Sequence, residues 1–220
     1  MSKLIVIEAG DGSGKATQTK LLFERLNADE KFAGKTHKIS FPDYTSDSSA
    51  LIKMYLSGKF GHDPADVNPY AASLFYAVDR YASFKMNREI FCEEDGIVLA
   101  DRYTTSNMAH QSAKIADSAE RDIFLQWLWD LEFVKIGLPV PDLVIFLDMP
   151  PRLSAELIAQ RGNKKDIHEK DANFLEKSYA AYNMLCEKYC WQRISCAKEN
   201  IIRSPQEIHE AVYAAVTRIL

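Results

Sequence analysis

One segment near the N-terminus constrains the possible folds most strongly. A continuously apolar, β-branched run at Lys3–Ile7 is followed by the glycine-rich stretch Gly10–Thr17, and helical spacing of leucines begins at Ala16. A short run of this kind suits a strand that is buried on both faces. A glycine-rich turn between such a strand and a helix is typical of the P-loop, whose backbone N–H groups converge on the phosphates of a nucleoside triphosphate. The segment therefore predicts a nucleotide-binding α/β fold.

The P-loop pattern also assigns roles within the stretch. It consists of a glycine, four further residues and then Gly-Lys-Ser/Thr, and Lys15 supplies the cation for the β- and γ-phosphates. Ala9 stands at the first glycine position, and Ala16 replaces the hydroxyl that usually binds Mg²⁺. We therefore expect Mg²⁺ to be held by phosphates, water and carboxylates, with Asp11 and Asp101 as the candidate ligands. The expected ATP-binding residues are Gly10, Asp11, Gly12, Ser13, Gly14, Lys15, Ala16 and Thr17.

Buried apolar runs alternate with helical patterns along the rest of the chain. Further strands are expected at 36–41, 96–100, 142–147 and 191–196, and helices at 49–56, 70–94, 118–136, from 150, at 172–189 and from 204. Ser204 and Glu207 form a capping-box pattern at the last helix, and Gly137 is a C-terminal stop. The alternation predicts a doubly wound five-stranded parallel sheet with helices on both faces, in a single domain spanning 1–220 with a small lid at about 161–171.

Composition narrows the classes of function. The chain has 220 residues with a formal net charge of −4, so no global basic field attracts nucleic acid, and no nucleic-acid partner is expected. No apolar run approaches the length of a membrane span, and no secretory segment precedes the first strand, so a cytoplasmic protein without a membrane partner is expected. Four cysteines without a CxxC or a histidine set are expected to be buried free thiols.

Several further segments resemble motifs of the thymidylate kinase family, in the family's order. They are Asp11–Lys15 with Thr17-Gln18, Phe41-Pro42, Leu74–Arg80, Asp101–Asn107 reaching Gln111, Pro141–Pro151 and Arg161-Gly162. The match extends from Ile5 to about Glu210. The phosphate loop is common to many NTPases, whereas its combination with the Asp-Arg-Tyr, Phe-Pro and Phe-Tyr…Arg segments is more specific.

The resemblance implies an activity and a set of roles. It implies transfer of the γ-phosphoryl group of ATP to dTMP, giving dTDP and ADP with Mg²⁺, in a homodimer. The implied catalytic residues are Lys15, Asp11, Arg102 and Arg161. The implied dTMP-binding residues are Asp11, Phe41, Tyr44, Tyr76, Arg80, Arg102, Asn107 and Gln111. Tyr76 would stack on thymine, and Arg80 and Asn107 would bind the base edge.

Two positions depart from the family pattern. Many members carry an arginine close after Phe-Pro that grips the acceptor phosphate, but Asp43 and Tyr44 follow here, which leaves Arg102 and the Tyr44 hydroxyl to hold the phosphate. His110 stands where the family often has an aromatic residue that crowds a ribose 2′-hydroxyl.

Other interpretations stay open from the sequence. A kinase for another nucleotide or for a deoxynucleoside is one, and a deoxynucleoside kinase would need a general base, for which Glu8 is placed. A nucleotide-binding regulatory module without kinase activity is another. A GTPase is not favoured, because no Asn-Lys-x-Asp run is present. The apolar helix around 124–133 is either an intersubunit surface or a core element.

Overall fold

The computed structural model describes residues 1–161 and 167–220, apart from the side chains at 160, 161, 169 and 170. Its main sheet is parallel, with strand order β2-β3-β1-β4-β5, and this confirms the predicted five-stranded α/β architecture. A two-stranded hairpin, β6-β7, follows the sheet and was not predicted. The strands are β1 (Lys3–Glu8), β2 (Thr36–Ser40), β3 (Ile97–Asp101), β4 (Leu143–Asp148), β5 (Gln192–Ser195), β6 (Ala197–Lys198) and β7 (Ile201–Ile202).

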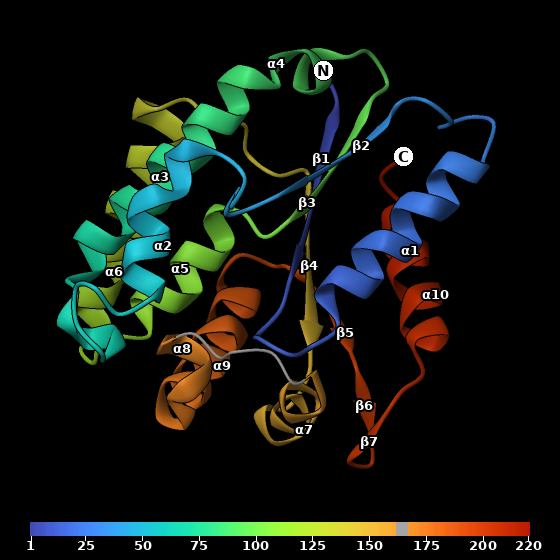
Figure 1. Ribbon diagram of the computed structural model, residues 1–220. Helices are drawn as coiled ribbons and strands as arrows, with labels where there is room; N and C mark the ends of the chain where they lie inside the picture. The colour runs from blue at the N-terminus through green and yellow to red at the C-terminus, as the bar shows by residue number, and fades with distance from the viewer. Residues whose placement is uncertain (162–166) are drawn as a thin grey trace.

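Helices cover both faces of the sheet (Figure 1). On one face lie α1 (Lys15–Ala28) and α10 (Pro205–Val216). On the other lie α3 (Pro69–Met86), α4 (Arg88–Cys92), α5 (Thr104–Ser112), α6 (Ser118–Trp129) and α9 (Ala172–Lys188). The remaining elements are η1 (Asp47–Ser49), α2 (Ala50–Leu56), η2 (Pro64–Asp66), η3 (Asp130–Lys135), α7 (Pro151–Arg161) and α8 (Ile167–Lys170).

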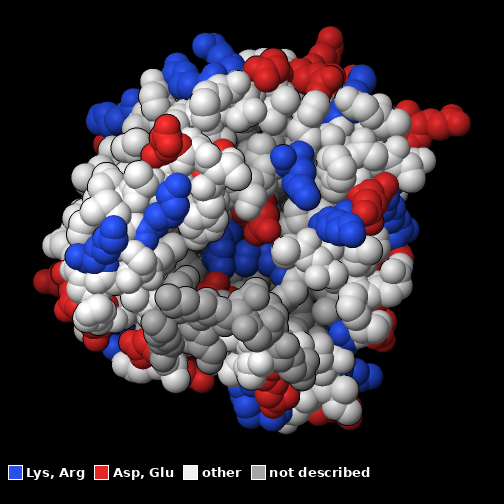
Figure 2. Space-filling view, in the orientation of Figure 1, with Lys and Arg blue, Asp and Glu red and all other residues white. Residues whose placement is uncertain are grey.

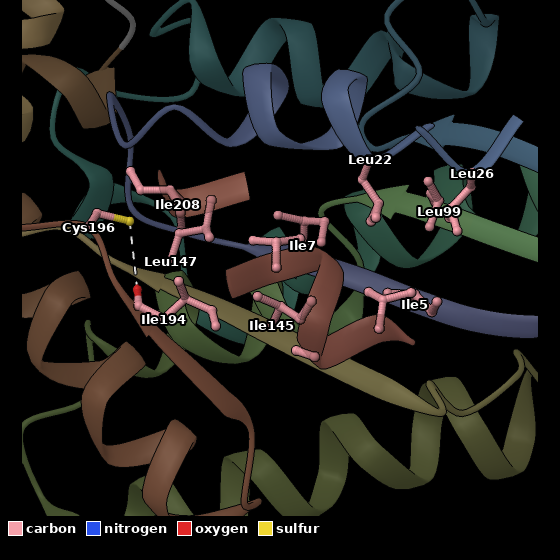
Figure 3. Close-up of a cluster of buried hydrophobic side chains, with 14 of the residues drawn as sticks. Ile5, Ile7, Leu22, Leu26, Leu99, Ile145, Leu147, Ile194, Cys196 and Ile208 are labelled. Atoms are coloured by element: carbon pink, nitrogen blue, oxygen red, sulfur yellow. Dashed lines mark hydrogen bonds between the residues drawn. The ribbon is translucent and has the colours of Figure 1, made fainter. Parts of the chain in front are cut away.

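Alternation along the central strand β1 assigns its side chains to two cores. Ile5 and Ile7 pack with residues of α1 and α10, as Figure 3 shows. Leu4 and Val6 face the opposite way and pack with residues such as Phe91 of α4. All four β1 side chains are at most 2% exposed. The continuously apolar run is therefore explained by a central strand that is covered on both faces.

Two predicted helices are shorter than expected. The predicted helix 70–94 was wrong as a single element, because α3 ends at Met86 and α4 begins at Arg88. Between them, Asn87 leaves helical geometry (φ −115°, ψ 29°), and its side-chain amide donates to the Ser83 carbonyl. Asparagine competes in this way for backbone groups, which disfavours a helix interior. Similarly, α6 ends at Trp129, and the chain continues to Lys135 in wider π-helical turns.

The helix termini and thiols were predicted with mixed success. Ser204 and Glu207 form the expected capping box at α10. The four cysteines are free, but Cys92 and Cys190 are exposed, so the prediction that all are buried was wrong for these two.

Within the described ranges, no helix is both long enough and apolar enough to cross a membrane.

Candidate active site

Two adjoining pockets lie at the carboxyl edge of the sheet, where ligands bind in open α/β folds. In Figure 2 the face is hollowed near its centre, and basic and acidic side chains meet there. The loop pocket, of about 750 Å³, is lined by residues 11–18 together with residues of β3, α7 and the 202–208 segment. The inner pocket, of about 130 Å³, lies among α3, α5 and the segment after β2. Both pockets are lined by Asp11, Phe41 and Arg102.

The glycine-rich loop has the geometry that the sequence predicts. Gly12 and Gly14 both have a φ of 77°, in the left-handed region. A Cβ atom on Gly12 would lie 2.6 Å from the Ile158 side chain and 2.7 Å from the Ser154 carbonyl oxygen, so only glycine fits. Helix α1 begins directly after, at Lys15. Residues 11–17 of the predicted ATP-binding set line the loop pocket, and Gly10 does not.

Lys15 is a buried cation at the start of α1. Its side chain is largely removed from water, and this desolvation, together with the nearby Arg102 guanidinium, lowers its pKa from 10.5 to about 8. Asp101, Asp11 and Glu8 act in the opposite direction and favour the charged form. The ammonium group therefore lies in an environment that stabilises it poorly, and a bound triphosphate would supply the missing negative charge.

Arg102 links the two pockets. It has a positive φ of 68°, which is rare for a residue with a side chain and typical of functional sites. Its guanidinium pairs with Asp11 and donates to Ser106 Oγ at 3.1 Å and to His110 Nε2 at 3.2 Å. Burial by itself would raise the pKa of the Asp11 carboxyl. The attraction of Arg102 and the other nearby cationic groups is larger, and it holds this pKa well below its usual range. Asp11 likewise raises the pKa of Arg102.

Glu8, at the end of β1, is a fully buried carboxylate that holds the start of α5. It accepts hydrogen bonds from the Tyr103 backbone N–H (3.1 Å), Thr105 Oγ1 (2.5 Å), Ser106 Oγ (2.6 Å) and Tyr182 Oη (3.0 Å). Four donors engage this carboxylate, which leaves it no capacity to act as a base toward a sugar hydroxyl. The deoxynucleoside kinase interpretation therefore loses its candidate base.

Arg80 reaches the inner pocket from α3 and is anchored by a residue that sequence reasoning missed. Its Nε and Nη2 donate to the two carboxylate oxygens of Glu132 at 2.6 Å and 2.5 Å, and both side chains are at most 2% exposed. Thr104 Oγ1 also donates to Glu132, at 2.7 Å. A bidentate pair of this kind fixes the plane of the guanidinium. The available signal was an acid placed between the apolar residues Leu131 and Phe133.

Asn107 presents an oriented hydrogen-bond acceptor to the inner pocket. Its Nδ2 lies 3.3 Å from the Ser73 carbonyl oxygen and 3.4 Å from Glu132 Oε1, so the amide nitrogen faces two acceptors. Its Oδ1 then points the other way and, like Gln111 Oε1, is buried without a hydrogen-bond partner among the described residues. Buried amide oxygens normally have partners, so these two indicate a ligand with N–H donors.

Asp79 is a second residue that the sequence did not single out. It is 1% exposed and accepts from the Asp43 backbone N–H at 3.0 Å and from Ser48 Oγ at 2.6 Å. These bonds hold the loop that carries Tyr44 at the rim of the inner pocket. Its position beside Arg80 was the only sequence signal.

The structure brings the predicted acceptor residues together. Every residue of that set lines the inner pocket: Asp11, Phe41, Tyr44, Tyr76, Arg80, Arg102, Asn107 and Gln111. Asp101 lines the loop pocket, as does Lys15. The side chain of Arg161 and residues 162–166 of the predicted lid lie outside the described part of the chain.

The site has a phosphate-binding loop at the carboxyl edge of a parallel sheet, and one arginine and one aspartate join it to a second polar pocket. This combination defines a P-loop phosphotransferase. Residues 7–208 match the family model described as thymidylate kinase. The chain belongs to the thymidylate kinase family, so it is an enzyme that phosphorylates dTMP to dTDP with ATP as co-substrate.

Individual relatives agree with this membership. The chain is 32% identical over 186 residues to the thymidylate kinase of Mycobacterium tuberculosis, covering 81% of this chain and 83% of that protein. It is 32% identical over 214 residues to the probable thymidylate kinase of Thermococcus onnurineus, covering 96% of each. The solved thymidylate kinase of Candida albicans is 20% identical, covers 99% of this chain and 92% of its own, and superposes with a TM-score of 0.75, which shows a shared fold.

Proposed function

We propose that the loop pocket holds ATP, that the inner pocket holds dTMP, and that the γ-phosphoryl group passes directly between them beside Asp11 and Arg102. The observation that supports this most is that both pockets are lined by these two residues. Direct transfer requires the donor and acceptor phosphates to meet, and a shared wall is where they can do so. Catalysis of this kind consists mainly of positioning and charge neutralisation.

The inner pocket suits the base edge of thymine. That edge has one N–H donor, N3, between two carbonyl oxygens. Asn107 Oδ1, which has no partner among the described residues, would accept from N3–H, and Arg80, whose plane Glu132 fixes, would donate to a neighbouring carbonyl. Tyr76 lies one helical turn before Arg80 and would stack on the ring. A cytosine edge has an unprotonated N3, which would face the Asn107 oxygen unfavourably.

The phosphate chemistry needs no general base, because the acceptor phosphate is already ionised at neutral pH. Lys15 would neutralise the donor β- and γ-phosphates from the loop pocket. Arg102 would bind the acceptor phosphate and reach toward the transferred group. Tyr44 lines the same pocket and would contribute its hydroxyl. The proposed contribution of Arg161 to this charge stays a prediction.

The residues present fit one Mg²⁺ ion bound mostly through the nucleotide. Asp101 lines the loop pocket, and no described group donates a hydrogen bond to its carboxylate. Asp11 is paired with Arg102 and is therefore the less available of the two predicted ligands. No described cluster of three or more His, Cys, Asp or Glu side chains could hold a metal by itself. Mg²⁺ commonly binds through one carboxylate, phosphates and waters, which is what Asp101 permits. The bound ion would neutralise charge on the phosphates.

A homodimer is also part of the proposal. Leu74, Val78 and Tyr81 form an apolar stripe on α3, and they are 45%, 57% and 40% exposed. Ile123 on α6 is 60% exposed. An i, i+4, i+7 stripe of this kind is suited to pack on another helix. A Val78→Glu variant should sediment as a monomer if this surface forms the dimer. The cytoplasmic location stays a prediction, which cell fractionation would test.

The direct test is ADP production with each acceptor in turn. The purified enzyme should turn over dTMP with ATP and Mg²⁺, accept dUMP less well because it lacks the methyl group, and leave thymidine and dCMP unused. An Asn107→Leu variant should lose dTMP turnover, whereas Asn27→Leu, on the far end of α1, serves as its matched control. Binding of nucleotide without ADP release from any acceptor would instead support a regulatory module.

A further inference from the structure

Two buried histidines stack against each other beside the proposed transfer point. His110 of α5 and His168 of α8 are 8% and 6% exposed, and their ring centroids lie 5.7 Å apart with an interplanar angle of 23°. Phe174 of α9 stacks on His110, with ring centroids 6.1 Å apart, and packs at a tilt of 40° against His168, at 4.7 Å. Both imidazoles line the inner pocket, and neither lines the loop pocket. The mechanism above assigns no role to either.

The contact with Arg102 determines the state of His110. An arginine can only donate, so Arg102 Nη1, at 3.2 Å, requires His110 Nε2 to accept. The His110 ring is therefore neutral, with its proton on Nδ1. Burial favours the same state and lowers the pKa of His110 well below its usual value. His110 thus supplies the third anchor for the guanidinium, beside Asp11 and Ser106.

A second set of contacts holds the other end of the stack. Lys114, just after α5, donates to Tyr55 Oη at 3.0 Å and to the Val67 carbonyl oxygen at 3.1 Å. Tyr55 is fully buried in α2, and its hydroxyl lies 2.9 Å from His168 Nε2. Because Lys114 can only donate, the Tyr55 oxygen accepts at that contact, and its own proton can go to His168. The contacts join α2, α5 and α8 around the pocket.

We propose that His110 and His168 are positioning residues for Arg102, and that Tyr55 and Lys114 hold His168 in the stack. In this arrangement His168 and Phe174 keep the His110 ring in one plane, and His110 Nε2 then orients the guanidinium toward the acceptor phosphate. The stack touches only the inner pocket, so its loss should weaken use of dTMP and leave use of ATP unchanged. The inference rests on the proposed placement of dTMP in that pocket.

The test uses ring-preserving substitutions in the full-length enzyme. His110→Phe keeps a stacking ring but removes the acceptor for Arg102, and should raise KM for dTMP about tenfold, the effect of losing one hydrogen bond to a charged group. His168→Phe removes the hydrogen bond to Tyr55, and Tyr55→Phe removes that bond together with the acceptor for Lys114. Each should raise KM for dTMP about threefold, as for a neutral hydrogen bond. KM for ATP should stay within twofold in all three variants.

Matched controls separate positioning from stability. His209→Phe replaces another buried histidine that packs on an aromatic ring, and Tyr213→Phe removes a hydroxyl on α10. Neither residue lines the loop pocket or the inner pocket, and both variants should leave the two KM values unchanged. Should Tyr55→Phe not fold, Lys114→Met removes the donor from a half-buried position instead.

The possible outcomes are distinct. An unchanged KM for dTMP in His110→Phe overturns the role of the stack. A change in His110→Phe alone overturns the role of Tyr55 and Lys114. An equal rise in both KM values would show a structural effect and would also contradict the inference. Absence of dTMP turnover in the unmodified enzyme would instead refute the proposed placement of dTMP.

Discussion

Replacing Lys15 with methionine should make the free protein more stable and the enzyme nearly inactive. Methionine has a similar length and no charge, so it fills the same space without the cost of a buried ammonium group. The unfolded chain has an ordinary lysine pKa of 10.5, whereas burial lowers the pKa of Lys15 in the folded protein to about 8. The folded protein thus binds this proton more weakly than the unfolded chain does.

The sign and size of the effect follow from proton linkage. A lysine whose pKa is lower in the folded protein than in the unfolded chain reduces the free energy of unfolding. The full reduction is present below the folded pKa, and it disappears as the pH rises to the unfolded pKa. A pKa difference of one corresponds to about 1.4 kcal/mol, so the cost at pH 7 is about 3 kcal/mol. Lys15→Met should therefore raise the free energy of unfolding by up to about 3 kcal/mol at pH 7, and by almost nothing above pH 10.5.

Urea unfolding without nucleotide measures this, with ADP production as the paired activity assay. Turnover should fall about a hundredfold to a thousandfold, as expected for loss of a cation at the transferring group. Lys20→Met, on the exposed face of α1, is the control and should change stability by no more than about 0.5 kcal/mol. A Lys15→Met protein that is no more stable than the unmodified one at pH 7, or that retains near-normal turnover, would refute the reasoning.

Three other perturbations have defined outcomes. Gly12→Ala places a Cβ atom 2.6 Å from Ile158 in a left-handed backbone conformation. ATP binding, measured by calorimetry, should be lost, and the free energy of unfolding from thermal unfolding should fall by at least about 1 kcal/mol. Unchanged binding would contradict the loop geometry. Glu132→Gln leaves the Arg80 charge buried without its carboxylate, so the free energy of unfolding measured in urea should fall by about 3–5 kcal/mol. A fall of less than about 1 kcal/mol would mean that the fold does not need the ion pair. Asp101→Asn should raise the Mg²⁺ concentration required for half-maximal turnover several-fold, whereas an unchanged Mg²⁺ titration would exclude Asp101 as the ligand.

Sequence motifs predicted which residues line the acceptor site, but not how their side chains are held. Tyr76, Arg80 and Asn107 could be named from the resemblance, and the structure places all of them on the inner pocket. The orientation of the Arg80 and Asn107 side chains could not be predicted, because it depends on Glu132, which lies 52 residues from Arg80 in the chain. Nothing near Glu132 in the sequence marks it as the partner of an arginine on another helix.

The positions of the helix breaks show the same limit at shorter range. Hydrophobic periodicity continues through Asn87 and through Trp129, so one long helix was predicted in each region. The competing side-chain bond at Asn87 and the wider turns after Trp129 are features of hydrogen bonding to the backbone, which hydrophobic periodicity does not contain.

The sequence by itself determined the glycine-rich loop, the buried strand before it and the alternation of strands and helices, because these depend on interactions among near neighbours: backbone torsions, caps and side-chain periodicity. Only the tertiary structure decided that Asp11 and Arg102 meet where two pockets join, that Glu8 is occupied by four donors, and that His110 and His168 stack. Those contacts join residues far apart in the chain, and their geometry exists only once the sheet has brought β1 and β3 side by side.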